Sequence, residues 1–544
     1  MQNSPNTKPR RSELLSPAGS LEKLKIAILY GADAVYAGTP DMSLRTKAAF
    51  TLEELVDGIE FAHKYGKRVY LTLNLFSHNR DIEKLPIFIE TIRKVKPDGL
   101  IIADPGIFYY VKQQAPELEL HVSTQANICS WLSVKFWEDM GASLCVMARE
   151  VSFPELTEIR HKCENIKLET FVHGSMCMAY SGRCLLSNFM AERGANQGNC
   201  AHNCRWNYKI HMRLKDGTIK DLEINEETKE LFDFFIEEEN RPGEYIELLE
   251  DERGAYLMNA KDLCLMPKLN EYLALGIDSL KIEGRHKGQY YVAAVTRAYR
   301  MAIDAWYNNP TEWDASPYMR ELYAIPNRGY SLAFHDERLT NLAHNYENTG
   351  SFAEWEFAGM VIGYEDDAII VEVKNLLKAG DVLEFMPPKE EDNILLRMYE
   401  FHDIKKKQVL NEIHAGPQPH IRIPMIWFDQ EDPVTLKERL PIYTVIRKEK
   451  ELSQEQLNRL RLDKEAQRLE LGKGSEKAYN DKKQELIDSI NDGTGERKPR
   501  TPRIGTTGCC GKGCNGCLIF WHDATYAKAR EIMRSKKIGE KLTA

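Results

Sequence analysis

Four cysteines in the middle of the chain have the spacing of a metal-binding set. They are arranged as C-x6-C-x15-C-x3-C among Gly, Ser and Asn residues that let the backbone curl around a compact object: Cys177, Cys184, Cys200 and Cys204. Four thiolates satisfy either a tetrahedral zinc ion or a 4Fe-4S cluster. Structural zinc sites usually draw on paired short loops, so the longer first gap favours the iron-sulfur cluster.

A second group of cysteines lies near the C-terminus. Cys509, Cys510, Cys514 and Cys517 stand close together in a Gly-rich segment. Their density predicts metal binding, and the Gly-rich loop is more typical of a ferredoxin-like loop than of a zinc knuckle. We expect either a second iron-sulfur cluster or a zinc ion there. Adjacent cysteines are awkward ligands for one ion, so one of Cys509 and Cys510 is spare in this interpretation.

The segment that carries this second group is basic, although the whole chain has a net charge of -9. From Glu496 to the end there are 11 Lys or Arg and 4 Asp or Glu. A segregated basic segment is compatible with RNA binding, and a solvated tail explains the charge equally well. Two roles therefore stay open for the extension: an electron-entry cluster, or a zinc-stabilised module that grips RNA.

The composition also indicates the compartment. No stretch approaches the roughly 20 apolar residues that cross a bilayer, and the first residues lack the apolar core of a signal peptide. We expect a cytoplasmic protein with no membrane contact, where clustered cysteines more often hold metal than form disulfides. The scattered cysteines are expected to be small core residues: Cys129, Cys145, Cys163 and Cys264.

Eight short apolar runs alternate with helical stretches in the first part of the chain. Such alternation implies parallel strands, and eight of them predict a TIM-like β/α barrel. An open doubly wound sheet is the alternative, ranked second because no Gly-rich dinucleotide fingerprint follows the first strand. The predicted strands lie within residues 13–15, 31–38, 68–74, 97–104, 119–124, 141–149, 167–172 and 276–285.

Polar residues stand where the predicted strands end, which is the face that carries a barrel's active site. The candidate catalytic residues are His121, Gln125, Asn127, His173, Glu283 and Arg285. Of these, His121, His173 and Glu283 are candidate proton carriers. A buried structural histidine and a helix-capping Asn are commoner roles for such residues.

Three arginines are candidates for holding an anionic substrate or co-substrate: Arg149, Arg183 and Arg285. Guanidinium groups pair with carboxylates and phosphates in a bidentate manner. Ordinary ion pairs with neighbours such as Glu150 or Glu283 explain the arginines at least as well.

The chain divides into five predicted parts. An insertion over residues 174–275 carries the first cysteine group, and its length exceeds the two to six residues usual for such connections, so we expect it to be functional. The parts are a disordered N-terminus (1–11), the barrel (12–330), a small β-barrel-like all-β domain (351–445), a charged linker or solvated helix (446–500) and the Cys-rich basic extension (501–544).

Several motifs in a consistent order resemble the family catalogued as U32 peptidases. They span about residues 12 to 405, and the similarity is greatest to the branch that hydroxylates uridine at carbon 5 in the tRNA anticodon loop. The motifs are ELLSPAGS, GADAVYAG, HVSTQAN, HGSMCMAYSGRC, NQGNCAHNCRW, KIEGR, NRGYSLAF and VKNLLKAGDVLEF.

The resemblance implies an oxygen-independent RNA hydroxylase that forms 5-hydroxyuridine in tRNA. It further implies a 4Fe-4S cluster on the four central cysteines, prephenate as the co-substrate that the hydroxyl group depends on, and an electron donor or the iron-sulfur assembly machinery as partners. In some relatives the fourth ligand comes from elsewhere in the chain, which keeps Cys264 as an alternative to Cys204.

Proteolysis of the collagenase-like kind is the second-ranked function. The sequence contains no H-E-x-x-H zinc helix and no G-x-S-x-G elbow, and cysteines that ligate a cluster are poor protease nucleophiles. Hydroxylation of ribosomal RNA or of a quinone ring also stays open, as does RNA binding without catalysis.

Overall fold

The computed structural model describes residues 10–39, 50–74, 77–176, 180, 260–336, 341–343, 351–405, 407–416, 419–428 and 432–491, and short strands between residues 211 and 255. The chain forms two compact units, Met1–Ser489 and Ile490–Ala544. The structure below is that of the first unit. Of the helices in the described residues, none is long and apolar enough to cross a membrane.

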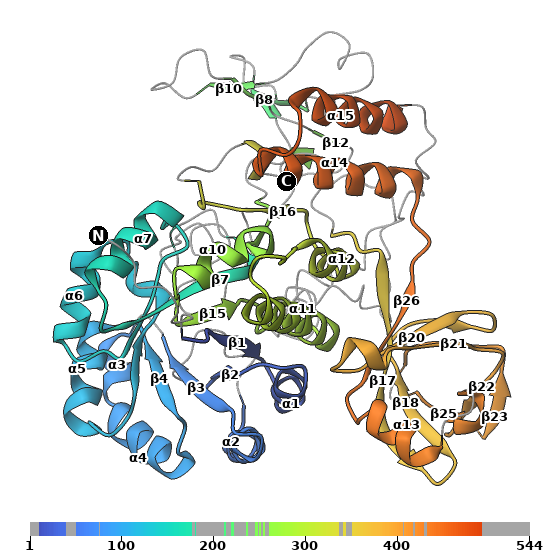
Figure 1. Cartoon of the computed structure of the whole chain (residues 1–544), viewed down its shortest axis with the longest axis horizontal. Coiled ribbons are helices and arrows are strands. Elements are labelled where there is room, and N and C mark those ends of the chain that lie inside the picture. The colour runs from blue at the N-terminus through green and yellow to red at the C-terminus, as the bar shows by residue number, and fades with distance from the viewer. Residues whose placement is uncertain are drawn as a thin grey trace. The chain divides into compact units, whose positions relative to one another are not determined.

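Eight parallel strands close into a barrel in the N-terminal part of the chain (Figure 1). They are β1 (Glu13–Ala18), β2 (Ala34–Gly38), β3 (Arg68–Leu73), β4 (Gly99–Ile102), β5 (Leu120–Val122), β6 (Leu144–Val146), β7 (Lys167–Ser175) and β15 (Ser279–Ile282). Strand β15 pairs with both β1 and β7, so the sheet has no open edge within the barrel. The predicted barrel is confirmed, and the doubly wound alternative is excluded.

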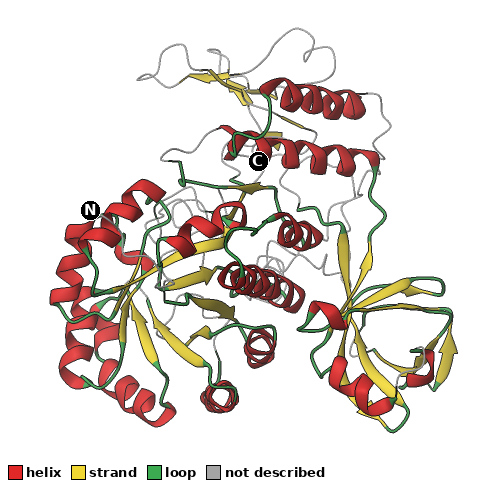
Figure 2. Cartoon of the chain, viewed as in Figure 1, coloured by secondary structure: helices red, strands yellow, loops and turns green. Residues whose placement is uncertain are grey.

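Helices connect the strands and cover the outside of the barrel (Figure 2). Helix α2 illustrates why they form: Thr51 and Glu54 make a capping box at its start, and its buried residues recur at helical spacing. The helices are α1 (Leu21–Leu29), α2 (Leu52–Lys64), α3 (Asn79–Ile82), α4 (Leu85–Val95), α5 (Pro105–Gln114), α6 (Trp131–Asp139), α7 (Phe153–Lys162), α10 (Leu269–Ala274), α11 (Gln289–Asn308) and α12 (Ser316–Ala324).

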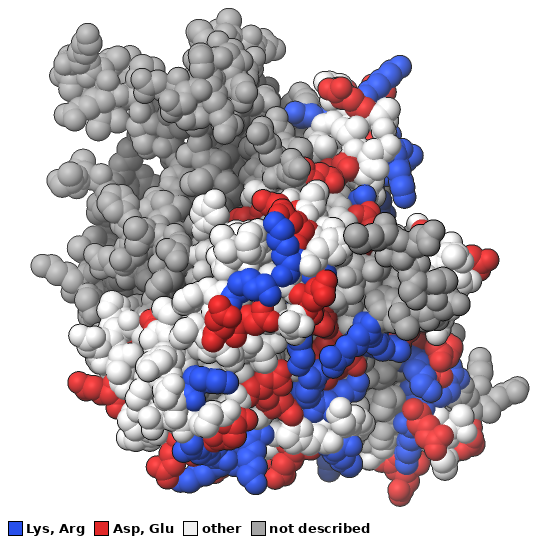
Figure 3. Space-filling model, turned by 60° about the vertical axis from the view of Figure 1, so that its left-hand side comes forward, with Lys and Arg blue, Asp and Glu red and all other residues white. Residues whose placement is uncertain are grey.

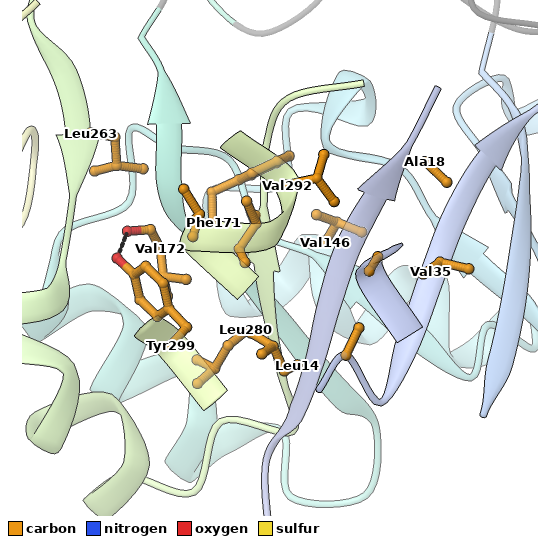
Figure 4. Close-up of a cluster of buried hydrophobic side chains, with 14 of the residues drawn as sticks. Leu14, Ala18, Val35, Val146, Phe171, Val172, Leu263, Leu280, Val292 and Tyr299 are labelled. Atoms are coloured by element: carbon orange, nitrogen blue, oxygen red, sulfur yellow. Dashed lines mark hydrogen bonds between the residues drawn. The ribbon is translucent and has the colours of Figure 1, made fainter. Parts of the chain in front are cut away.

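An apolar layer between the strands and the helices holds the barrel together (Figure 4). Leu14, Val172 and Leu280, each fully buried, belong to this layer with Tyr299 of α11. The Tyr299 hydroxyl donates a hydrogen bond to the carbonyl oxygen of Val172 at 2.8 Å. Helix α11 is thereby fixed to β7, the strand that leads into the cysteine-bearing insertion.

Two further strands extend the barrel sheet beside β7. Strand β14 (Asp262–Cys264) pairs antiparallel with the end of β7, with Cys264 opposite His173 and Asp262 opposite Ser175. Strand β16 (Tyr330–Ser331) pairs with β14. The segment predicted as an insertion therefore starts on β7 and returns to the barrel through β14 and α10.

The next part of the chain is an antiparallel sheet domain with its own apolar core, which confirms the predicted all-β domain. Its strands run in the order β21-β20-β26-β17-β18-β25-β22-β23. Their bounds are β17 (Trp355–Glu365), β18 (Ala368–Val373), β20 (Val382–Met386), β21 (Ile394–Arg397), β22 (Phe401–Asp403), β23 (Gln408–Leu410), β25 (His420–Pro424) and β26 (Val445–Glu449). Helix α13 (Pro433–Arg439) precedes the last strand.

The charged segment after this domain forms helices, one of which is partly buried. It starts within β26 and continues into α14 (Gln454–Glu470) and α15 (Glu476–Asn491). Helix α14 buries Leu460 and Ala466, and its Asp463 pairs with Lys261 at 2.9 Å. The charge pattern alone did not reveal this, because a charged residue such as Asp463 can be buried where it pairs with an opposite charge, here Lys261.

Candidate functional site

Contacts between non-adjacent strands identify the side chains that fill the inside of the barrel. Lys281 on β15 lies over the ring of Tyr36 on β2, 4.6 Å from Nζ to the centroid, although β1 separates these strands. Tyr70 on β3 lies 4.5 Å from His121 on β5 between ring centroids, although β4 stands between them. The interior of this barrel therefore contains aromatic and charged side chains beside aliphatic ones such as Leu15 and Ile101, where Val, Ile and Leu usually dominate.

A layer of ion pairs lies at the N-terminal ends of the strands. Arg68 pairs with Glu13, and Lys167 pairs with Glu119 at 2.9 Å. His121, which is fully buried, places Nε2 3.2 Å from the same Glu119 oxygen. This contact with His121 lowers the pKa of Glu119 to about 2 against the opposing effect of burial. The predicted proton carrier His121 thus contacts the layer at the barrel face usually associated with stability.

A short chain of polar groups continues from this layer through the barrel. Ser279 Oγ lies 3.4 Å from Glu13 Oε1 and 2.8 Å from Glu169 Oε2. The other oxygen of Glu169 accepts from Lys281 Nζ at 2.7 Å. Glu169 and Ser279 are fully buried, and Lys281 is nearly so. The chain ends at Lys281, next to the last residue of β15.

At the C-terminal end of the barrel, three cations surround two aromatic rings. Arg149 Cζ lies 4.3 Å from the Phe171 centroid, and Lys281 Nζ lies 5.5 Å from the same ring. Arg285 Cζ lies 5.9 Å from the Tyr36 centroid, and Arg285 Nη1 donates to Thr72 Oγ1 at 2.9 Å. The cations come from three places, β15, the loop after β15 and the loop after β6.

This cation group has the character of an anion site. The positive charges of this group, of which that of Lys281 is paired with Glu169, attract a negatively charged ligand, and the two rings offer its apolar part a flat surface. Within the described residues, the buried Nε of Arg149 has no hydrogen-bond partner, so it can donate to a ligand without losing a bond. On the face shown in Figure 3, by contrast, Lys and Arg are interspersed with Asp and Glu.

His173 and Glu283 lie where β7 meets the insertion. His173 is buried among Tyr291, Tyr299 and Tyr330, with ring centroids 5.4 to 5.9 Å apart. Burial lowers its pKa to about 3, so the imidazole is neutral near pH 7. The carboxylate of Glu283 accepts from the backbone N–H of Ser175 at 3.1 Å. Both residues hold the end of β7 in place.

Gln125 and Asn127 lie in the turn that follows β5. Ser123 Oγ donates to the side-chain oxygen of Gln125, and Asn127 ends a single 3-10 turn with a left-handed φ of 51°. Asn adopts this conformation more readily than most residues. These two residues stand at the C-terminal end of their strand, as predicted from the sequence.

The remaining predicted ligands lie outside the described residues. These are Arg183 and all eight clustered cysteines: Cys177, Cys184, Cys200, Cys204, Cys509, Cys510, Cys514 and Cys517. In the part of the chain that the structure describes, no group of three or more His, Cys, Asp or Glu could hold a metal ion. Met176 alone separates the end of β7 from Cys177 in the sequence.

The scattered cysteines are buried with one exception. Cys145, Cys163 and Cys264 are buried, whereas Cys129 is exposed, so the expectation of a core residue is wrong for Cys129. It follows the turn after β5 and precedes α6, where the chain reaches the surface. Burial raises the pKa of the Cys264 thiol to about 12, which disfavours the thiolate that a metal requires.

The sequence-based reasoning missed Glu169, Ser279 and Lys281. A usable signal existed, because Ser279 and Lys281 alternate with Leu280 and Ile282 along β15. Polar residues at every second position of a strand that is buried on both faces indicate a polar barrel interior.

Comparisons with known proteins extend over most of this unit. A model of peptidase family U32 matches residues 19–345, and a model of the peptidase family U32 C-terminal domain matches residues 353–436. The tRNA hydroxylation protein P of Escherichia coli K12 is 39% identical over 409 residues, which are 72% of this chain and 89% of that protein. The tRNA hydroxylation protein P1 of Bacillus subtilis 168 is 36% identical, covering 70% of this chain and 85% of that protein.

A ribosomal RNA enzyme is also similar. The 23S rRNA 5-hydroxycytidine C2501 synthase of Escherichia coli K12 is 31% identical over 391 residues, which are 70% of this chain and 53% of that protein. The region shared with all three relatives thus has a length compatible with the barrel and the antiparallel domain together.

Proposed function

The chain belongs to peptidase family U32, and we propose that it is an RNA hydroxylase that forms 5-hydroxyuridine in tRNA. Relatives named for tRNA hydroxylation are 39% and 36% identical to it, and an rRNA hydroxycytidine synthase is 31% identical. The structural observation that carries the proposal is the group of Arg149, Lys281 and Arg285 at the barrel mouth. A site of three cations suits polyanionic RNA and an anionic co-substrate.

We propose prephenate as that co-substrate. Its two carboxylates match a site that contains several cations, and its ring matches the faces of Tyr36 and Phe171. In this proposal Arg149 and Arg285 bind carboxylate or phosphate oxygens. Lys281 is paired with Glu169 in the structure and so faces the ligand from a fixed position.

We further propose a 4Fe-4S cluster on Cys177, Cys184, Cys200 and Cys204. Four thiols suit such a cluster, which supplies one-electron chemistry when it is bound. The first of them follows the end of β7 by two positions, and Glu283 holds that end through Ser175. The cluster would require an electron donor or the iron-sulfur assembly machinery as partners.

The C-terminal cysteines and the compartment complete the proposal. Cys509, Cys510, Cys514 and Cys517 would bind a second iron-sulfur cluster or zinc, in a segment whose basic charge suits RNA. We place the protein in the cytoplasm, with tRNA.

Peptidase activity has less support in the described residues. Burial raises the pKa of both the Cys145 and the Cys264 thiols to about 12, so neither is a ready nucleophile. His173, four positions before Cys177 in the sequence, is kept neutral among three tyrosines. A general base for an acyl-transfer site would need an accessible nucleophile beside it.

The proposal is tested by nucleoside mass spectrometry of tRNA and rRNA from a strain that lacks the protein. Derivatives of 5-hydroxyuridine should disappear from tRNA and return with the wild-type protein. Arg149→Gln should restore less than a tenth of them, whereas Arg93→Gln, at an exposed position of α4, should restore them fully. If a hydroxylated nucleoside disappears from rRNA alone, the substrate of the protein is rRNA and not tRNA. Unchanged nucleosides in both RNAs would refute the proposal.

A further inference from the structure

A single serine hydroxyl stands between two buried carboxyl groups inside the barrel. Ser279 Oγ lies 2.8 Å from Glu169 and 3.4 Å from Glu13. Ser279 and Glu169 are fully buried, and Glu13 is 8% exposed. A hydroxyl has one hydrogen to donate, so it cannot donate to two carboxylates at once.

The hydrogen bonds are all satisfied if Glu13 carries a proton on Oε1. Glu13 then donates to Ser279, and Ser279 donates to Glu169, which already accepts from Lys281. The second oxygen of Glu13 still accepts from Arg68 and from the Tyr70 hydroxyl, which lies 3.1 Å away. A protonated Glu13 therefore pairs every polar group along this line.

The electrostatic surroundings of Glu13 are consistent with this assignment. Burial raises the pKa of Glu13 to about 7, and the charges of Glu169 and Asp33 act in the same direction. Arg68 and the hydrogen bond from Tyr70 act in the opposite direction and do not cancel the effect of burial. Near neutral pH, Glu13 can both hold and release a proton.

We propose that Glu13, Ser279 and Glu169 form a proton relay that recharges Lys281, the proton donor at the barrel mouth. The inference rests on the proposed hydroxylase function. The outer end of the relay is at the N-terminal face of the barrel. Arg68 is 40% exposed there and Glu13 is 8% exposed, so water can reach Glu13 from that side. An RNA bound across the mouth would leave this route open.

The proton steps balance without any change in oxidation state. An N–H bond of Lys281 breaks, and its proton passes to a basic oxygen of the anionic co-substrate. The Glu13 proton moves to Ser279 while the Ser279 proton moves to Glu169. The Glu169 carboxyl group then rotates about its Cγ–Cδ bond, which brings the protonated oxygen to Lys281, and it gives the proton to Lys281. Glu13 takes a new proton from water. Lys281 is the catalytic residue here, and the other three are positioned to supply it.

The test compares variants of full-length, anaerobically purified protein in tRNA hydroxylation. Ser279→Ala interrupts the relay, and Ser279→Thr keeps the hydroxyl. Glu119→Gln is the matched control, because Glu119 belongs to the same ion-paired layer as Glu13 and not to the line. We expect Ser279→Ala to lower kcat about hundredfold to ten-thousandfold, the range of one general acid–base contribution, with KM unchanged. Ser279→Thr and Glu119→Gln should keep most of kcat.

The pH profile and infrared spectra separate a relay from a packing role. The kcat of the wild type should fall as pH rises through about 7, because the proton leaves Glu13 there, and this inflection should vanish in Ser279→Ala. The infrared band of a protonated carboxyl group should titrate in the same range and be absent in Glu13→Gln. Equal losses in Ser279→Ala and Ser279→Thr, or no such band, would overturn the relay. Inactive wild-type protein that shows the band would refute the hydroxylase and leave the protonation of Glu13 intact.

Discussion

Lys281 and Glu169 form an ion pair of 2.7 Å inside the barrel, with side chains 5% and 0% exposed. Removing one partner leaves a buried charge without compensation, which costs about 3 to 5 kcal/mol. We therefore predict that Lys281→Met and Glu169→Leu each lower the free energy of unfolding by about that amount in urea titrations. The double variant should recover most of the loss. Losses in the double variant that equal the sum of the single losses would show that the two charges are not coupled.

The raised pKa of Glu13 predicts a specific dependence of the free energy of unfolding on pH. Its pKa in the folded protein is about 7, raised by burial from an ordinary value of 4.5. As pH rises, the unfolded chain releases this proton at a lower pH than the folded protein does. The contribution of Glu13 to stability is therefore present below pH 4.5 and is lost as pH rises to about 7. The loss amounts to about 3 kcal/mol. The difference in unfolding free energy between Glu13→Gln and wild type should change by this amount over that range, and a constant difference would contradict the raised pKa.

Gly174 is predicted to tolerate no side chain. Its φ is +127°, and a Cβ there would lie 2.6 Å from Glu283 Cβ. Gly174→Ala should lower the free energy of unfolding by about 1 to 3 kcal/mol, the usual range for a strained backbone conformation. The control is Gly363→Ala, because a Cβ at Gly363 would meet no atom within 4 Å. Equal stability of both variants would show that the junction of β7 with the insertion adapts easily.

The cysteine assignments predict which thiols hold iron. Cys177→Ser should remove the colour and iron of the proposed 4Fe-4S cluster from anaerobically purified protein, measured by visible absorption and iron content. Cys129→Ser, at an exposed position, should keep colour and iron. Cys264→Ala should keep them as well, because its thiol is packed against Tyr299 and Met319. Stoichiometric zinc without iron, in protein made under iron-replete anaerobic conditions, would contradict the iron-sulfur assignment.

The fold was predictable because its signal is repeated. Seven of the eight parallel strands are short runs that follow a helix, and closure by β15 adds only one pairing to that pattern. The interior was not predictable in the same way. Lys281 lies in an apolar run, yet its partner Glu169 is 112 positions away in the sequence, and no local pattern joins them. His121 shows the opposite difficulty, because it was predicted to be a proton carrier while its contacts belong to the N-terminal ion pairs.

The most direct test of the hydroxylase assignment is reconstitution with purified components. Anaerobically purified protein is incubated with tRNA that lacks hydroxylated uridine, prephenate and a chemical reductant, and the nucleosides are analysed by mass spectrometry. The account predicts 5-hydroxyuridine that depends on both the protein and prephenate, with turnover at least about tenfold lower in Arg149→Gln, the effect of losing a hydrogen bond to a charged group. No hydroxylated nucleoside from iron-replete protein, together with cleavage of gelatin or casein by the same preparation, would contradict it.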